Sequence, residues 1–205
     1  MKKHHHQSGA TLVEALVAVL IFAIGMVGIA GLMSAAIKYQ TGNEARFNVS
    51  AALNDLSERI RVNAPGANGY TGILNGVAAT GTGYLLAETY AAQTSAAAAT
   101  YSPDCSSASC TPAQLAAYDL AKWRNVLRDT LPGGAGYITG NVTDGFNVSV
   151  MWFDKSAVDA SGTLLDTRAC SNAASDKTSG KARFCCPSDA SAPSGVRCYT
   201  TKVIP

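Results

Sequence analysis

The sequence predicts an α+β protein, in which a long N-terminal helix packs on a small head with an antiparallel sheet and an extra short helix. Two changes of pattern carry this prediction. An apolar run near the N-terminus passes into an amphipathic helical stripe. Beyond residue 132 the apolar residues alternate instead, which is the period of a strand. Six cysteines lie in the second half of the chain, so the C-terminal region is expected to be stapled by disulfides.

The apolar run extends from Thr11 to Ile37 and contains one carboxylate, Glu14, close to its start. No other charged residue follows until Lys38. Crossing a bilayer takes roughly 20 apolar residues, so this run predicts a membrane-spanning helix. A carboxylate in such a helix costs roughly 2.5–3.5 kcal/mol on insertion scales, which marks Glu14 as a functional residue.

The helical pattern continues beyond the apolar run, in an amphipathic half over residues 38–64. One stripe of residues recurs every three or four positions: Ala45, Val49, Leu53, Leu56 and Ile60. Asp55 with Arg59, and Glu58 with Arg61, are spaced for ion pairs on the exposed face. Ala64-Pro65-Gly66 ends the pattern, so a single helix is expected from Thr11 to Asn63.

A second helix is predicted after a long connection. Residues 66–104 are rich in small and turn-forming residues and are expected to be mostly loop, with a short helix over residues 89–99. Thr111 and Gln114 have the spacing of a capping box, and Pro112 suits the first turn. The apolar face of this helix comprises Ala116, Leu120, Trp123, Leu127 and Leu131.

Strands follow this helix. Tyr137 to Val142 is one candidate, and the Asp144-Gly145 pair predicts a tight hairpin turn into an alternating strand from Phe146 to Phe153. Another arm is expected at residues 163–168, and Cys198 to Ile204 is expected to be the last, edge strand. Helix first and sheet afterwards is typical of an α+β head over residues 65–205.

The N-terminus resembles type IV prepilins and type II secretion pseudopilins. The motif reads Gly9, Ala10, Thr11-Leu12-Val13-Glu14 after a basic leader, with the apolar run behind it. The resemblance implies that a prepilin peptidase cuts between Gly9 and Ala10 and methylates Ala10, and that Glu14 is the charge used in subunit docking. Ala10 departs from the more common Phe. The alternatives are a plain signal anchor and a secretory signal peptide, and the long apolar run fits the second less well.

A central segment resembles minor pilins of the PilV type, the type IV pilus modification proteins. It contains Cys105, Cys110-Thr111, Tyr118-Asp119-Leu120 and Leu131-Pro132-Gly133-Gly134. The resemblance implies a type IV pilin-like fold divided into a leader over 1–9, a membrane and assembly half over 10–37, an amphipathic half over 38–64 and the head. It also implies a prepilin peptidase, a major pilin, other minor pilins and the inner membrane as partners. The protein would then pass from the bacterial inner membrane, as a single-pass protein, to the extracellular pilus.

Charge and histidine content limit the functions. The chain has 16 Lys and Arg against 14 Asp and Glu, and removing Lys2 and Lys3 with the leader leaves 14 against 14. The positive charge therefore lies in the leader, which predicts a cytoplasmic leader and a periplasmic head. No nucleic-acid partner is expected from a neutral chain. All three histidines, 4 to 6, also lie in the leader, so the mature chain would lack His-based catalysis and His-ligated metal.

The cysteines predict disulfides rather than a metal site. They are Cys105, Cys110, Cys170, Cys185, Cys186 and Cys198. An even number on the exported side is typical of a disulfide framework. Cys105 and Cys110 are expected to pair because they are close in sequence and precede a capped helix. Cys170 and Cys198 are then expected to pair with Cys185 and Cys186, in an order that stays open. Zinc is the competing interpretation, but there is no Cys-x-x-Cys pair.

No catalytic constellation stands out, so the protein is expected to be a non-enzyme without cofactor or metal. The leading hypothesis is a minor pilin that primes, enters or modifies a type IV pilus, with roles in twitching motility or adhesion. A type II secretion pseudopilin and a membrane-anchored adhesin or binding module are the alternatives.

Overall fold

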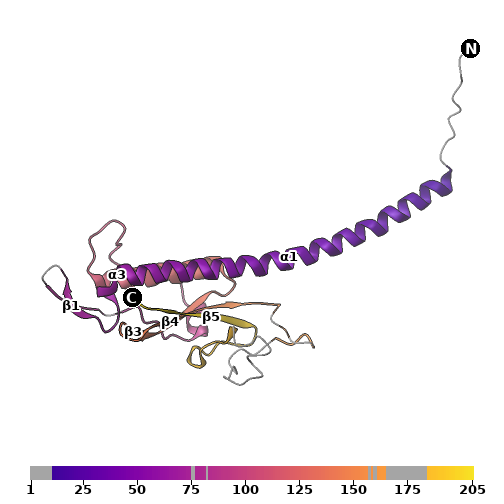
Figure 1. Cartoon of the computed structure of the whole chain (residues 1–205). Coiled ribbons are helices and arrows are strands. Elements are labelled where there is room, and N and C mark those ends of the chain that lie inside the picture. Colours follow the sequence, from indigo (N-terminus) through magenta and orange to yellow (C-terminus); the bar gives the residue numbers. More distant parts are fainter. Residues whose placement is uncertain (1–10, 75–76, 82, 157, 159–160, 165–183) are drawn as a thin grey trace, which may run out of the picture. The chain divides into compact units, whose positions relative to one another are not determined.

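The computed structural model describes residues 11–74, 77–81, 83–156, 158, 161–164 and 184–205. It divides into two compact units, an N-terminal unit over Met1–Glu44 and a head unit over Ala45–Pro205. Helix α1 (Leu12–Val62) contributes to both units and is labelled in Figure 1. The single long helix predicted from the sequence is confirmed, to within one residue at each end.

Within the head unit, the amphipathic stripe of α1 is its buried face. Val49, Leu53, Leu56 and Ile60 are each at most 4% exposed. The two predicted ion pairs are present on the other side of the helix, each at 2.8 Å: Arg59 with Asp55 and Arg61 with Glu58. The helix then gives way to the short 3-10 helix η1 (Ala64–Gly66), which contains the predicted stop at Pro65.

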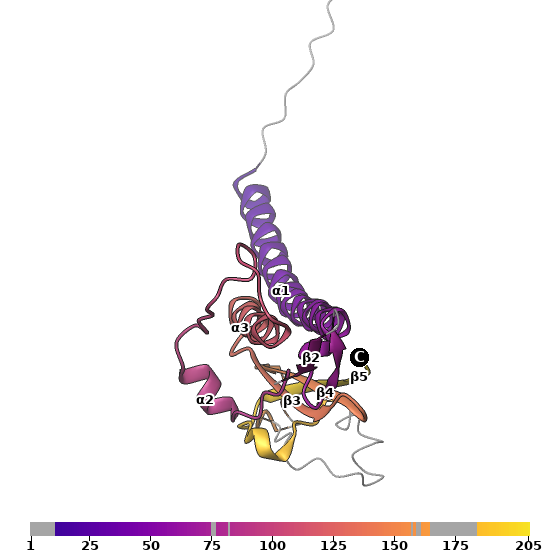
Figure 2. The same ribbon diagram turned by 90° about the vertical axis from the view of Figure 1, so that its left-hand side faces the viewer.

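Helix α3 (Pro112–Thr130) packs against α1. Its predicted capping box is confirmed: the Thr111 hydroxyl accepts from Gln114 N, and the side-chain Oε1 of Gln114 accepts from Thr111 N. Figure 2 shows the two helices next to each other on one side of the sheet. The Trp123 ring is buried, and its Nε1 donates to the α1 carbonyl of Ala52 at 2.9 Å.

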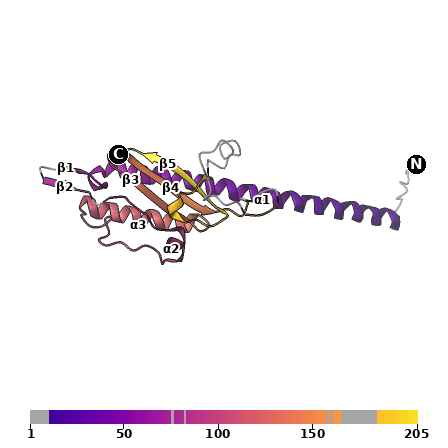
Figure 3. The same ribbon diagram turned by 90° about the horizontal axis from the view of Figure 1, so that it is seen from below.

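The main sheet has three antiparallel strands in the order β3-β4-β5 (Figure 3). They are β3 (Ala135–Asn141), β4 (Gly145–Phe153) and β5 (Val196–Val203). The predicted hairpin at Asp144-Gly145 is confirmed by the pairing of Asn141 with Gly145. The predicted last strand is also confirmed at an edge of this sheet, although it begins and ends slightly earlier than expected.

Both faces of β4 are buried. Phe146, Val148 and Val150 lie in the core beneath α1 and α3. On the opposite face, Met151 joins a second cluster with residues of the C-terminal segment that includes η3 (Ser188–Ala190), and Figure 2 shows η3 on that side. The alternating pattern in the sequence predicts burial of the first face only. Burial of the second face depends on a segment that is distant in the sequence.

The C-terminal segment is also held to the helix side of the sheet. The Phe184 ring has the Arg46 guanidinium 5.9 Å from its centroid and that of Arg197 at 4.7 Å. Its edge meets the Trp152 ring at 6.4 Å, and Arg197 in turn pairs with Asp154 at 2.9 Å. Cation–π contacts of this kind contribute about 0.5–1 kcal/mol each at exposed sites.

The expectation of mostly loop over residues 66–104 is wrong in one place. Strands β1 (Thr71–Leu74) and β2 (Val77–Thr80) form an antiparallel hairpin. Their sequence carries the signal, since Asn75-Gly76 between two short β-prone runs is a strong hairpin indication. The short helix within residues 89–99 is confirmed as α2 (Tyr90–Ser95).

The arm expected at residues 163–168 falls largely outside the described residues. Only its first two positions are described, and Leu164 makes an isolated antiparallel bridge to Val158.

Truncating Trp123 should destabilise the head. Trp123→Ala leaves a cavity in the core of the head and is expected to lower the free energy of unfolding by about 3–5 kcal/mol. Trp123→Phe removes the hydrogen bond to Ala52 and should lower it by about 1–2 kcal/mol. Pulse proteolysis of the full chain in urea measures both. Val126→Ala, on the exposed side of the same helix, is the control and should change it by less than about 0.5 kcal/mol.

Candidate assembly segment and the network that supports the head

Glu14 lies in the first turn of α1, with its side chain exposed. The Thr11 hydroxyl accepts a hydrogen bond from Glu14 N at 3.3 Å, and the Thr11 carbonyl accepts from Ala15 N. Thr11 therefore caps the helix, a role that the sequence analysis did not assign. A carboxylate in the first turn also interacts favourably with the helix dipole. Gly9 and Ala10 lie outside the described residues.

The helix around Glu14 is apolar on all sides and uncovered by the rest of the described chain. Every residue from Leu12 to Ile37 is exposed. Gly25, Gly28 and Gly31 leave open space, since a Cβ built at any of them meets no atom within 4 Å. By length and composition this helix can cross a membrane. Such a surface is stable only against lipid or against other helices, and small residues allow helices to approach closely.

Comparison with known families gives one match. Residues 4–30 match the model of the prokaryotic N-terminal methylation motif. Neither the curated proteins nor the solved structures give a match to this chain.

The fold is type IV pilin-like, as expected from the sequence: a long apolar N-terminal helix, a three-stranded antiparallel sheet, extra helices and disulfides toward the C-terminus. Together with the motif, it supports a type IV pilin or pseudopilin-like protein. The motif implies processing by a prepilin peptidase, membrane anchoring and assembly with other pilins. Proteins that carry it are generally structural rather than enzymatic.

The described cysteines are in disulfides. Cys105 bonds Cys110 at 1.96 Å, and Cys186 bonds Cys198 at 2.00 Å. Cys185 is disulfide-bonded as well, whereas Cys170 lies outside the described residues. These sulfurs are therefore not thiolate ligands, and no group of three or more His, Cys, Asp or Glu that could hold a metal occurs in the part of the chain that the structure describes.

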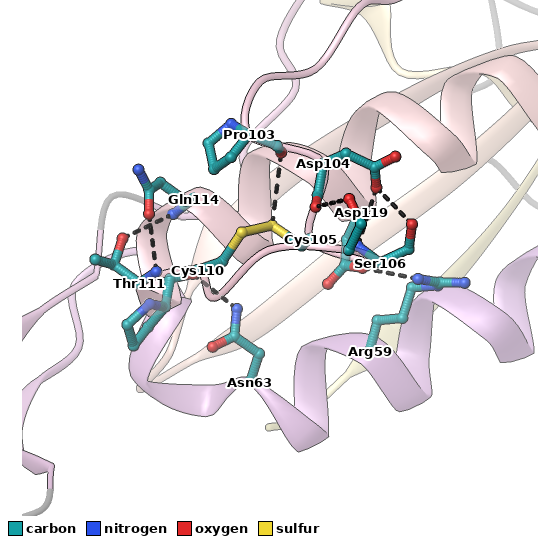
Figure 4. The surroundings of a disulfide bond; sticks show 12 residues. Arg59, Asn63, Pro103, Asp104, Cys105, Ser106, Cys110, Thr111, Gln114 and Asp119 are labelled. Carbon is teal, nitrogen blue, oxygen red and sulfur yellow. Dashed lines mark hydrogen bonds and ion pairs between the residues drawn. A yellow bond between two sulfur atoms is a disulfide. The ribbon is translucent and has the colours of Figure 1, made fainter.

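A buried polar network joins α1 to α3 beside the first disulfide (Figure 4). Arg59 Nη1 donates to Asp119 Oδ1 at 2.7 Å, while Arg59 Nε donates to Asp55. The Tyr84 hydroxyl donates to Asp119 Oδ2 at 2.8 Å and accepts from Asn63 Nδ2 at 3.0 Å. Asp119 is only 3% exposed, so both of its oxygens depend on these partners.

The network also reaches the start of α3. Asn63 Nδ2 donates to the carbonyl of Pro112 at 2.9 Å, directly after the disulfide and the capping residue Thr111. Gly66 is part of the same contact, because a Cβ there would clash with the Pro112 carbonyl oxygen. These contacts fix the position of the end of α1 relative to the beginning of α3.

The network shifts two pKa values. The hydrogen bond to Asp55, and after it the one to Asp119, raise the pKa of Arg59 above its usual range. Burial raises the pKa of Tyr84, and its bond to Asp119 acts in the same direction. Arg59 therefore stays a cation and Tyr84 a neutral donor throughout the physiological pH range.

Sequence analysis missed this network, apart from the Asp55–Arg59 pair. One signal was available: Asp119 occupies the apolar face of its helix, three positions after Ala116 and four before Trp123. A carboxylate on a buried face requires partners. No local pattern indicates that Tyr84, from the long connection, is one of them.

Stability should fall at alkaline pH, and Tyr84 should contribute to that fall. The folded protein holds the Tyr84 proton more tightly than the unfolded chain, whose pKa is about 10. The stabilisation is therefore complete below about pH 10 and is lost as pH rises toward the folded value. Urea unfolding between pH 8 and 11 measures the slope. Tyr84→Phe should make it shallower, and the exposed Tyr199→Phe should not.

Proposed function

We propose that this chain is a minor pilin of the PilV type, which takes part in type IV pilus biogenesis by priming, entering or modifying the filament. The observation that carries the proposal is the methylation motif, with one carboxylate inside an otherwise apolar and uncovered helix. The resemblance of the segment from Cys105 to Gly134 supports the PilV type. That segment folds as a disulfide followed by a capped helix.

Maturation would begin with cleavage between Gly9 and Ala10 and methylation of the new amine at Ala10. Residues 1–9 form the leader, residues 10–37 the membrane and assembly half of the helix, and residues 38–64 its amphipathic half. Residues 65–205 form the head. Lys2 and Lys3 keep the leader in the cytoplasm by the positive-inside rule.

The head would lie in the periplasm before assembly and outside the cell afterwards. Its disulfides support this location, because such bonds form and persist in oxidising compartments. The partners would be the prepilin peptidase, a major pilin and other minor pilins.

Glu14 would select the correct docking of subunits. Cleavage leaves a positive amine at Ala10, four positions before Glu14 in the sequence. In lipid an unpaired carboxylate is unfavourable by roughly 2.5–3.5 kcal/mol. A neighbouring subunit's amine relieves this penalty only in the correct axial register, so the charge favours that register over others.

A type II secretion pseudopilin carries the same N-terminal motif, so the two machines are distinguished by phenotype. Deleting the gene should abolish or reduce surface pili and twitching motility and leave protein secretion unchanged. Loss of secretion with normal pili would assign the chain to the secretion machine instead.

Leader cleavage is expected after Gly9. N-terminal sequencing and intact-mass measurement of protein from its native host should give a chain that begins at methylated Ala10. Gly9→Leu should block cleavage and leave the chain uncut, because the motif requires a residue without a side chain at the cut. A wild-type chain that still begins at Met1 would contradict the prediction.

Charge removal at Glu14 is expected to impair entry into the filament and to leave membrane insertion and cleavage intact. Glu14→Ala and Glu14→Gln should each lower the fraction of the protein in sheared pili by about tenfold, equivalent to about 1.4 kcal/mol of docking free energy. Glu44→Gln, at an exposed position of the same helix, is the matched control and should behave as wild type.

The glutamine variant separates docking from helix capping. Gln serves at the third helical position of a capping box about as well as Glu, so a residue that only supports the helix terminus would tolerate it. Wild-type incorporation of Glu14→Gln would therefore refute the docking role.

A further inference from the structure

Helix α1 is supported in two different ways along its length. Its apolar run ends at Ile37, and the uncovered surface up to that point is suited to lipid or to other helices. Packing within the head begins at Ala45, the first residue of the head unit, which is partly buried against the main core cluster. The seven residues 38–44 lie between these two points, so neither kind of support reaches them.

Side chains in this segment add little to the stability of the helix. Gln40, Asn43 and Glu44 are exposed, and they form no hydrogen bond or ion pair with their side chains among the described residues. Neither Lys38 nor Glu44 has an opposite charge three or four positions away. The segment therefore lacks the ion pairs that are present near the end of the same helix.

Intrinsic helix propensity is low in the same place. Thr41, Gly42 and Asn43 are consecutive and are all poor helix formers, glycine being the least favourable residue after proline. A Cβ built at Gly42 meets no atom within 4 Å, so packing inside this chain does not require a glycine there. The glycine acts on the backbone instead, because a residue without a side chain loses the most conformational freedom on entering a helix.

Opening the helix in this segment breaks fewer interactions than opening it on either side. In the apolar half, each broken main-chain hydrogen bond would leave polar groups in hydrocarbon, where no water replaces the lost partner. In the head half, opening would expose Leu53, Leu56 and Ile60, which are at most 4% exposed. Local unfolding of native proteins begins where buried apolar contacts are few and the backbone reaches water, which is the situation of residues 38–44.

We propose that residues 38–44 form a hinge in α1, at which the helix opens and re-forms while both halves stay folded. The segment comprises about two turns, or roughly 10 Å of helix. An open hinge allows the head to change direction without a structural change in the head or in the apolar half.

The hinge would allow the two halves to meet a neighbouring subunit in separate steps. The apolar half docks in its register first, and the head then packs without moving that half. This consequence rests on the proposed pilin function, whereas the hinge itself depends only on the residues of the segment.

Hydrogen exchange of the full chain in detergent tests for the local opening. Amides of residues 38–46 should exchange at least about a hundredfold faster than those of residues 52–60. Gly42→Ala should slow the exchange of the first segment about fivefold, because alanine favours the helix. Gly25→Ala is the matched control, since it makes the same change in the same helix, also without a clash, and should leave residues 38–46 unaffected. Equally slow exchange in both segments, or no effect of Gly42→Ala, would overturn the proposal.

Pairs of spin labels measure the bending itself. Labels at Ser34→Cys and Ser50→Cys span the segment and lie about 24 Å apart along a straight helix. Labels at Val17→Cys and Ser34→Cys span about 26 Å inside the apolar half and serve as the control. All three positions are exposed.

The first pair should give a broad distribution of distances that extends below about 24 Å and becomes narrower in Gly42→Ala. The control pair should give a narrow distribution with or without that substitution. Two distributions of equal width would refute the hinge. Because both measurements use the monomer in detergent, such a result would leave the proposed pilin function untouched.

Discussion

The head depends on one buried ion pair, between Arg59 at the end of α1 and Asp119 on α3. Burying the Asp119 carboxylate is favourable only because both of its oxygens have partners: Arg59 binds one, and the Tyr84 hydroxyl, itself held by Asn63, donates to the other. Removing one partner of such a pair typically costs about 3–5 kcal/mol, whereas the complete pair adds little to stability. Its effect is to favour one alignment of the two helices, and the apolar core then packs in that alignment.

Local and long-range contacts meet at the start of α3. The Cys105–Cys110 disulfide closes the loop before it, the capping box at Thr111 begins the helix, and the Pro112 carbonyl receives Asn63 from the end of α1. A disulfide contributes about 2–4 kcal/mol, mainly by restricting the unfolded chain. In a small head with a limited core, these contacts supplement the burial of apolar side chains.

Sequence analysis succeeded where a structure is determined by neighbouring residues. Helices α1 and α3, the capping box and the Asp144-Gly145 hairpin follow from local spacing. The hairpin of β1 and β2 also had a local signal, Asn75-Gly76. It was overlooked because the many small and turn-forming residues of the segment 66–104 favoured a loop. Three features join residues far apart in the sequence: the Tyr84 contact, the hydrogen bonds between the Gln93 side-chain amide and the main chain of Gly136, and the second cluster beneath β4. No periodicity in the sequence predicts them.

The burial of β4 on both faces limits where the head can vary. Phe146, Val148 and Val150 face one cluster and Met151 the other, so most successive positions of this strand are fixed by packing. A substitution that alters surface chemistry there would disturb a core. Sequence variation that changes the surface of the head is therefore expected in the connecting segments, because loops reach solvent and tolerate insertions. The sheet can therefore stay constant while the loops that it supports change in sequence and length.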